Sequence, residues 1–195
     1  KRLTPYIEPK LKVAPKGDFI SFTTNKGGKY KVWTVNLKTG KHKRIHKGGI
    51  KYYQRELDHS FPMIAWHPGG EKISYVHERR GKIYITTVDL LTKKKSKILF
   101  LKFDKITGFA YSDNGNTLII SAIRKGQSDL YLYDMQTRRE RQITNDPFDD
   151  LMPVYADGGS KILFASNRNS DSLGAAAPMT LSHNNNLDIY VYDLE

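Results

Sequence analysis

A unit of four short β-prone segments recurs along this 195-residue chain and constrains its fold more than any other feature. In the clearest copy the segments are 109–111, 118–121, 130–133 and 141–144. Turn-forming residues separate them, which is typical of an antiparallel meander with tight hairpins. A single sheet of this kind has two faces to bury and cannot bury both alone. We therefore expect neighbouring copies to stack on it.

Two landmarks reveal the other copies. The turn after the first segment recurs at 15–18, 68–71, 113–116 and 157–160, and the exit from the third segment recurs at Asn36, Asp89, Asp134 and Asp193. The exits are 53, 45 and 59 residues apart. A basic period of about 40–45 residues with four strands is the signature of a β-propeller blade. The longer intervals contain insertions around 48–58 and 169–186.

The sequence therefore predicts an all-β fold, a β-propeller of four-stranded antiparallel blades with about four blades in one domain. We expect blade copies over roughly 5–46, 59–99, 104–144 and 148–195, with residues 1–4 as the outer strand of a preceding or closing blade. Either that strand closes a ring of four, or the chain is an arc of a larger propeller of six or so blades. The second arrangement is favoured because the chain starts at Lys1, without Met or a signal peptide.

The residues at the strand exits have a structural interpretation. Asn36, Asp89 and Asp134 are each followed three positions later by a threonine. A short carboxylate or amide at the head of a turn accepts hydrogen bonds from backbone N–H groups two or three residues on. We therefore expect these side chains to hold the turn rather than a ligand.

Positive charge is concentrated in the first half of the chain. Residues 1–100 contain 23 lysines and arginines against 7 acidic residues, and residues 101–195 contain 9 against 13, which together give the net charge of +12. A basic edge is expected where third and fourth strands join, at Lys41, Lys43, Arg44, Lys93, Lys94 and Lys95. Lysines on outer strands discourage sheet-to-sheet aggregation. Alternatively, they form a patch for anionic lipid, glycan, nucleic acid or an acidic protein.

An acidic residue precedes the first strand of every copy. These residues are Glu8, Asp58, Asp104, and Asp149 with Asp150. Gathered near a channel mouth, their carboxylates would hold a cation or a basic peptide. The alternative is that they accept hydrogen bonds from the loop backbone or face solvent, which we favour.

Catalytic and cofactor motifs are absent from the sequence. There is no Gly-x-Ser-x-Gly elbow, no His-Glu-x-x-His, no phosphate-binding glycine loop, no calcium loop and no cysteine. We expect His77-Glu78 to be a polar turn, and the spacing of His42 and His46 suits a metal only on a helix. The sequence predicts no catalytic residue, metal or cofactor.

The abundant tyrosines predict a packed sheet. Tyr131, Tyr133, Tyr190 and Tyr192 alternate along two expected strands, as core residues do, so we do not favour nucleic-acid binding. A long loop over 169–186, rich in small and uncharged residues, is either mobile or a partner-contacting excursion.

Residues 155–168 read Tyr-Ala-Asp-Gly-Gly-Ser-Lys-Ile-Leu-Phe-Ala-Ser-Asn-Arg, and residues 187–194 follow as Leu-Asp-Ile-Tyr-Val-Tyr-Asp-Leu. This sequence pattern resembles the TolB-type propeller repeat, which has a turn, an apolar strand, Ser-x-Arg, Asp-Ile-Tyr and Asp-Leu. The exit strand 141–144 and the turn 66–70 are similar to the same pattern. The resemblance covers nearly the whole chain, although the Ser-Pro-Asp-Gly turn is nowhere intact.

The resemblance implies a propeller without enzymatic activity, periplasmic or associated with the outer membrane. Its expected partners are other cell-envelope proteins, and its role is that of an interaction scaffold. The same kind of propeller also gates prolyl-oligopeptidase-like hydrolases, so a gating propeller whose catalytic domain lies outside this chain is the alternative. A second alternative is binding of an anionic glycan or nucleic acid by the basic half.

Overall fold

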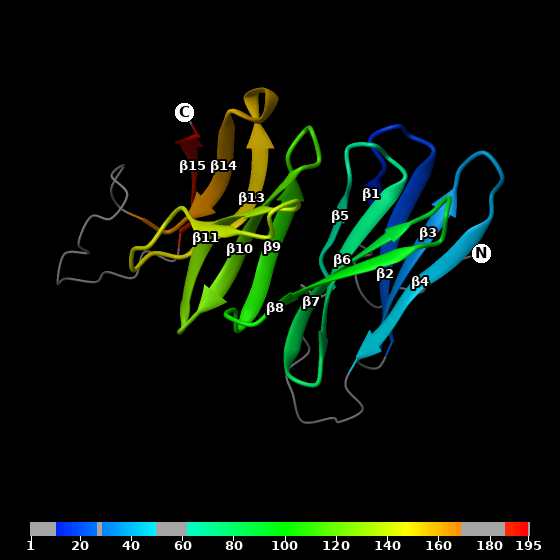
Figure 1. Cartoon of the computed structure of the whole chain (residues 1–195), viewed down its shortest axis with the longest axis horizontal. Helices are drawn as coiled ribbons and strands as arrows, with labels where there is room; N and C mark the ends of the chain where they lie inside the picture. Colours follow the sequence, from blue (N-terminus) through cyan, green and yellow to red (C-terminus); the bar gives the residue numbers. More distant parts are fainter. Residues whose placement is uncertain (1–10, 27–28, 50–61, 169–185, 195) are drawn as a thin grey trace. The chain divides into compact units, whose positions relative to one another are not determined.

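The computed structural model describes residues 11–26, 29–49, 62–168 and 186–194, and nearly all of its regular structure is β-strand (Figure 1). The all-β prediction is confirmed. The chain divides into two compact units, residues 1–99 and 100–195. The predicted outer strand at residues 1–4 and the long loop at 169–186 lie outside the described residues, except for Asn186.

The first unit contains two antiparallel meanders with strands in chain order (Figure 1). The first sheet has strands β1 (Lys12–Val13), β2 (Phe19–Lys26), β3 (Lys29–Asn36) and β4 (His42–Gly49). The second has strands β5 (Ile64–Trp66), β6 (Lys72–Arg79), β7 (Lys82–Asp89) and β8 (Lys95–Phe100).

The second unit repeats this arrangement. Its first sheet has strands β9 (Lys105–Tyr111), β10 (Thr117–Arg124), β11 (Gln127–Asp134) and β12 (Glu140–Gln142). Its other sheet has three strands among the described residues: β13 (Asp150–Ala156), β14 (Lys161–Ser166) and β15 (Asp188–Asp193). A short 3-10 turn, η1 (Asp157–Gly159), joins β13 to β14.

The turn between the first two strands has the same geometry in three sheets. Gly17, Gly70 and Gly115 have φ angles of 72°, 76° and 74°, in the region where glycine carries no steric penalty. The N–H of each glycine donates to the carbonyl oxygen three residues earlier at 2.8 Å. The fourth turn differs, because Asp157 and both glycines after it have positive φ and form η1.

The exits from the third strands are held as the sequence predicts. The Asp134 Oδ1 atom accepts hydrogen bonds from the N–H groups of Gln136 at 2.9 Å and Thr137 at 2.7 Å. Asp89 makes the same pair of bonds, and Asn36 accepts from the Thr39 N–H at 2.9 Å. The interpretation of these side chains as turn-stabilising groups is confirmed.

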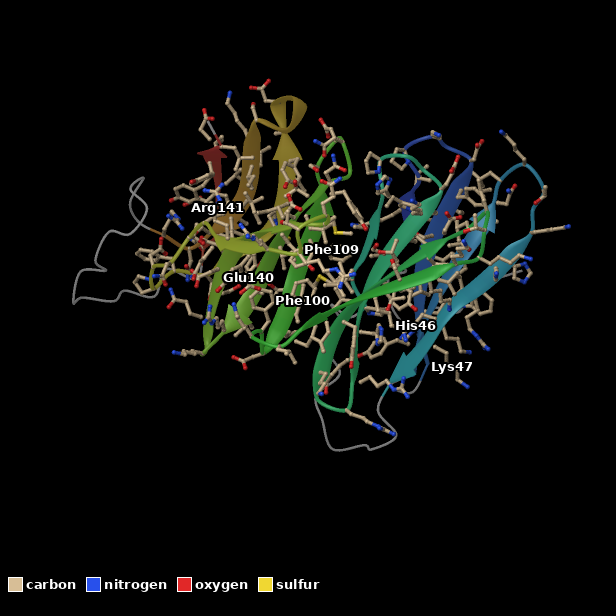
Figure 2. All side chains as sticks on the ribbon, in the orientation of Figure 1. His46, Lys47, Phe100, Phe109, Glu140 and Arg141 are labelled. Atoms are coloured by element: carbon tan, nitrogen blue, oxygen red, sulfur yellow. The ribbon has the colours of Figure 1, made fainter. Side chains whose placement is uncertain are left out.

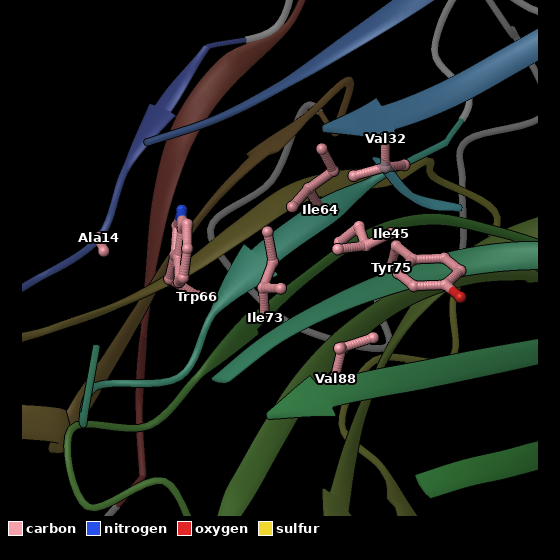
Figure 3. Packing of buried hydrophobic residues seen from close by; sticks show 8 residues of the cluster. All are labelled: Ala14, Val32, Ile45, Ile64, Trp66, Ile73, Tyr75 and Val88. Carbon is pink, nitrogen blue, oxygen red and sulfur yellow. The ribbon is translucent and has the colours of Figure 1, made fainter. Parts of the chain in front are cut away.

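The core of the first unit lies between its two sheets. Figure 3 shows Val32 and Ile45 from the first sheet meeting Ile73, Tyr75 and Val88 from the second. Trp66 completes the contact, because its indole N–H lies 3.0 Å from the Ser21 hydroxyl and 3.3 Å from the Lys12 carbonyl oxygen. Residues far apart in the sequence therefore join the two sheets through both apolar contact and hydrogen bonding.

The core of the second unit is built in the same way. Ile119 and Leu130 pack against Ile162 and Phe164 of the neighbouring sheet, and the half-buried Tyr190 and Tyr192 lie against this cluster. The other face of the β9–β12 sheet contains Tyr131 and Tyr133, which contact the rings of Phe103 and Phe100 respectively. The alternating tyrosines are core residues, as predicted.

Two local predictions differ from the structure. His77-Glu78 lies inside β6 rather than in a turn, because the paired strands β6 and β7 continue to Arg79 and Lys82. The first strand of the clearest copy begins at Lys105 instead of Phe109. A register shift beside Ser121 lets β9 continue its pairing with β10 beyond Gly108, and such shifts leave no mark in an alternation pattern.

Two isoleucines of the second unit offer a matched test of the sheet packing. Ile119 is fully buried, whereas Ile189 is 79% exposed. We expect Ile119→Ala to lower the free energy of unfolding by about 2–5 kcal/mol, because it removes buried methyl groups and leaves a cavity. The control Ile189→Ala should change it by less than about 0.5 kcal/mol. Urea denaturation measures both, and equal losses would contradict the stacked-sheet core.

Candidate binding surfaces

The acidic residues that precede the first strands have different environments. Glu8 and Asp58 lie outside the described residues. A carboxylate oxygen of Asp104 accepts a hydrogen bond from the Lys125 N–H at 2.8 Å. Asp149 is exposed, whereas Asp150 is fully buried. Asp104 therefore already accepts a hydrogen bond within the protein, and Asp150 pairs with Arg168. The shared cation or peptide site stays a prediction.

Asp150 is bound by a buried arginine. The Nη2 atom of Arg168 lies 2.7 Å and 2.9 Å from the two carboxylate oxygens of Asp150, and 3.3 Å from the Oδ2 atom of Asp146. Its Nε–H donates to the Ser166 hydroxyl at 3.0 Å. Arg168 is only 4% exposed, so these are ion pairs with little screening by solvent.

Aromatic rings enclose the same guanidinium group. Its central carbon lies 5.4 Å from the ring centres of Phe164 and Tyr190 and 6.0 Å from that of Phe148. These distances fall within the range of cation–π attraction. The Tyr190 hydroxyl also donates to the carbonyl oxygen of Arg168 at 2.8 Å. Arg168 therefore joins β15, the end of β14 and the segment that enters β13.

The segment that connects β12 to β13 is fixed by alternate residues. Thr144, Asp146, Phe148 and Asp150 are buried, while the residues between them are exposed. The Thr144 hydroxyl accepts a hydrogen bond from the Leu130 N–H at 2.9 Å, and Asp146 accepts one from the Phe148 N–H at 3.2 Å. This connection is therefore held rigidly, with Asn145, Pro147 and Asp149 facing outward.

Asp129 lies at the start of β11 and is 3% exposed. One oxygen accepts a hydrogen bond from the Gln142 amide at 3.1 Å, while the other has no partner among the described residues. Burial raises the pKa of Asp129 to about 6, and the negative charges of Asp150 and Asp146 add to the effect. Three carboxylates thus share a region that contains one arginine.

Sequence reasoning missed this cluster because its members are separated by up to 39 residues along the chain. Only one signal was present, the Ser166-x-Arg168 pair of the repeat. It placed an arginine after an apolar strand but did not identify its carboxylate partners. The cluster is a structural connection between elements of the second unit, and its arginine and three carboxylates, Arg168, Asp129, Asp146 and Asp150, are buried.

The basic edge has the predicted location. Lys41 precedes β4, Lys43 and Arg44 lie on it, Lys93 and Lys94 precede β8, and Lys95 begins it. β4 and β8 are the last strands of their sheets, and all six residues are exposed. The ammonium group of Lys95 differs from the others in having a fixed contact, since it donates to the Ile45 carbonyl oxygen at 3.3 Å.

The described part of the chain contains no group of three or more potential metal-ligating side chains. His42 and His46, which the sequence pairs only on a helix, are both in strand β4. The described residues also include no helix with the length and apolarity needed to cross a membrane.

Comparison with known proteins identifies the repeat. The family model of the TolB beta propeller domain matches residues 61–173, more than half of the chain.

Solved structures share the fold. TolB from Acinetobacter baumannii superposes with a TM-score of 0.67 at 14% identity, and the match covers 95% of this chain and 41% of that one. An acylaminoacyl peptidase gives 0.60 at 16% identity, covering 95% and 30% of the two chains. A puromycin hydrolase gives 0.62 at 13% identity, covering 80% and 24%. At these identities the likeness shows the fold alone, and the chain spans less than half of each protein.

The buried arginine provides a test of the connection between β12 and β13. We expect Arg168→Met to lower the free energy of unfolding by about 3–5 kcal/mol, because it leaves Asp146 and Asp150 buried without their counter-ion. The exposed Arg139, in the same unit, serves as the control, and Arg139→Met should change stability by less than about 0.5 kcal/mol. Guanidinium chloride denaturation at pH 7 compares the two, and similar effects would contradict a structural role for Arg168.

The raised pKa of Asp129 predicts a characteristic pH dependence. Between pH 4 and pH 6 the folded state binds more protons at this site than the unfolded state, so the contribution of Asp129 to stability falls as pH rises through this range. We expect Asp129→Asn to be more stable than the parent at pH 7.5 and to lose that advantage at pH 4.5. Urea denaturation at both pH values measures the difference, and a constant difference would rule out titration of Asp129 in this range.

Proposed function

Because the chain belongs to the TolB β-propeller domain family, we propose that it is a non-catalytic scaffold that binds other proteins of the bacterial cell envelope. The family match over residues 61–173 is the observation that carries this proposal. The proposed location is the periplasm or the periplasmic side of the outer membrane. The partners are proposed to be envelope or outer-membrane proteins.

The proposed mechanism is presentation of fixed loops on rigid sheets. Connections between strands carry binding residues most effectively when the scaffold beneath them does not move. The segment from Thr144 to Asp150 meets this condition, because its alternate residues are buried and bonded. Its exposed residues, Asn145, Pro147 and Asp149, are then a preorganised contact surface, which lowers the entropy lost on binding.

A gating propeller is the second candidate. The structural likeness to an acylaminoacyl peptidase and a puromycin hydrolase favours it, since the two are named as a peptidase and a hydrolase. In that case the catalytic domain belongs to the longer protein, and the propeller selects substrates for it. A hydrolase domain encoded in the same open reading frame supports gating. An envelope-anchoring or peptidoglycan-binding module in that position supports the scaffold.

Cross-linking in the native bacterium tests the scaffold. We expect the tagged protein to fractionate with the periplasm or outer membrane and to cross-link to one or a few envelope proteins, and the purified partner should bind it saturably. Asp149→Lys should weaken that binding at least fivefold, because it reverses a charge on the exposed connection. Asp113→Lys, which changes an exposed acid in the turn after β9, is the matched control.

Recovery from the cytoplasm, or the absence of any saturable envelope partner, would reject the scaffold. Equal weakening by both charge reversals would show that the connection before β13 is not the contact surface.

A further inference from the structure

A cluster of aromatic and basic side chains in the first unit has no role in the functions considered so far. The imidazole of His46 lies with its ring centre 4.5 Å from that of Tyr75 and 5.1 Å from that of His77. His77 in turn stacks on Tyr84, with centres 5.4 Å apart and planes 14° apart. The cluster joins β4 of one sheet to β6 and β7 of the other.

A β-bulge places His46 in this cluster. The pairing of β3 with β4 shifts between Val32 and Trp33, so that Val32 is opposite His46 and Trp33 is opposite Arg44. Ile45 is the extra residue. In a regular strand neighbouring side chains point to opposite faces, yet Ile45 lies in the core and His46 contacts Tyr75 on the same side. Bulges re-aim side chains in this way and are frequent beside functional sites.

A lysine charge acts on each of the two imidazoles, that of Lys95 on His46 and that of Lys97 on His77. Lys95 and Lys97 alternate along β8 and therefore extend from one face of it, and the Lys95 ammonium is anchored 3.3 Å from the Ile45 carbonyl oxygen. Burial lowers the pKa of His46 to about 4, with further contributions from His77 and Lys95. Burial also lowers the pKa of His77, followed by the charges of Lys97 and Arg79. No carboxylate in the described part of this unit contributes to either shift.

The two histidines have different hydrogen bonding. The Nε2 atom of His77 lies 2.8 Å from the Thr86 hydroxyl. The ring nitrogens of His46 have no hydrogen-bond partner among the described residues. Figure 2 shows His46 on β4 beside the exposed Lys47. His46 is thus a half-buried imidazole on which the Lys95 charge acts, and its ring is tilted by 36° against that of His77, on which the Lys97 charge acts.

We propose that His46, Lys95 and Lys97 form a binding site for an oxyanion of the phosphate or sulfate class. Two ammonium groups repel a metal cation but attract such a group, which accepts charge-assisted hydrogen bonds from lysine and protonated histidine. The negative charge of the ligand favours the imidazolium form of His46. Binding of the anion therefore takes up a proton, and the affinity rises as pH falls toward the unperturbed histidine value.

Sulfate is the probe for this site, because it remains a dianion across the pH range of the experiment. In NMR titrations of the 195-residue chain, we expect sulfate to shift the His46 ring resonances saturably. The affinity should increase about fivefold between pH 8 and pH 6, as linkage to one histidine requires. The same anion should raise the pKa of His46 measured from its ring protons.

Three variants separate this site from general attraction to a basic protein. Lys97→Met removes one exposed ammonium of the site and should weaken sulfate binding at least fivefold. Gly48→Ala should weaken it similarly, since a Cβ atom at residue 48 would lie 2.6 Å from the His46 Nε2 atom and displace the ring. Lys94→Met, which removes a neighbouring exposed lysine, should change the affinity less than twofold. Thermal unfolding confirms that each variant is folded.

The source of the anion is distinguished with vesicles. Flotation with phosphatidylglycerol vesicles, but not phosphatidylcholine vesicles, that is reversed by sulfate identifies a lipid headgroup. Sulfate binding without flotation identifies a free anion or phosphate ester. The proposal is wrong if sulfate leaves the His46 resonances unshifted, or if Lys94→Met and Lys97→Met weaken binding equally. None of these results depends on whether the chain binds an envelope protein.

Discussion

Strand β10 has apolar side chains on both of its faces, and burying both requires packing partners on two sides. In β10, Ile119 faces one way and Ile120 the other, yet both are fully buried. This strand therefore needs packing partners on both faces, which a single meander does not provide. Stacking of the two sheets within each unit covers one side, through Val32 and Ile73 in the first unit and Ile119 and Ile162 in the second. On the other face of the β9–β12 sheet, Phe103 and Phe100 pack on Tyr131 and Tyr133.

Some polar groups in this fold connect neighbouring sheets. The Ser121 hydroxyl of β10 donates to the Asp150 carbonyl oxygen at 2.7 Å, and Arg168 holds the Asp150 side chain. These bonds fix the position of β13 relative to β10, which apolar contact alone specifies loosely because it is non-directional. The unpaired oxygen of Asp129 shows the cost of such a network, since a carboxylate buried beside two others becomes a weaker acid. Rigidity of the connections, which presentation of a binding surface requires, follows from this network.

The repeat, the strand order and the turn chemistry were predictable from the sequence because they depend on local rules. Gly17, Gly70 and Gly115 stand where positive φ is needed, and Asp134 bonds to residues only two and three positions away. The Arg168 cluster and the His46 cluster were not predictable, because their members meet only after two sheets have stacked. His77 was expected in a turn because its neighbours are charged. Its strand assignment follows from pairing with Tyr84, a residue in a different segment. Edge positions such as Lys95 were predictable, but their contacts across sheets were not.

The extra residue in β4 has a consequence for how such a protein diversifies. β4 is the outermost strand of its sheet, so only β3 pairs with it there. An inserted residue at this rim shifts the side chains beyond it without disturbing a second neighbour, whereas the same insertion in β2 or β3 would misalign strands on both sides. The outermost strands are thus the places where repeated blades can come to differ in side-chain arrangement by the insertion of single residues. In this protein the extra residue Ile45 places the half-buried imidazole of His46 against Tyr75.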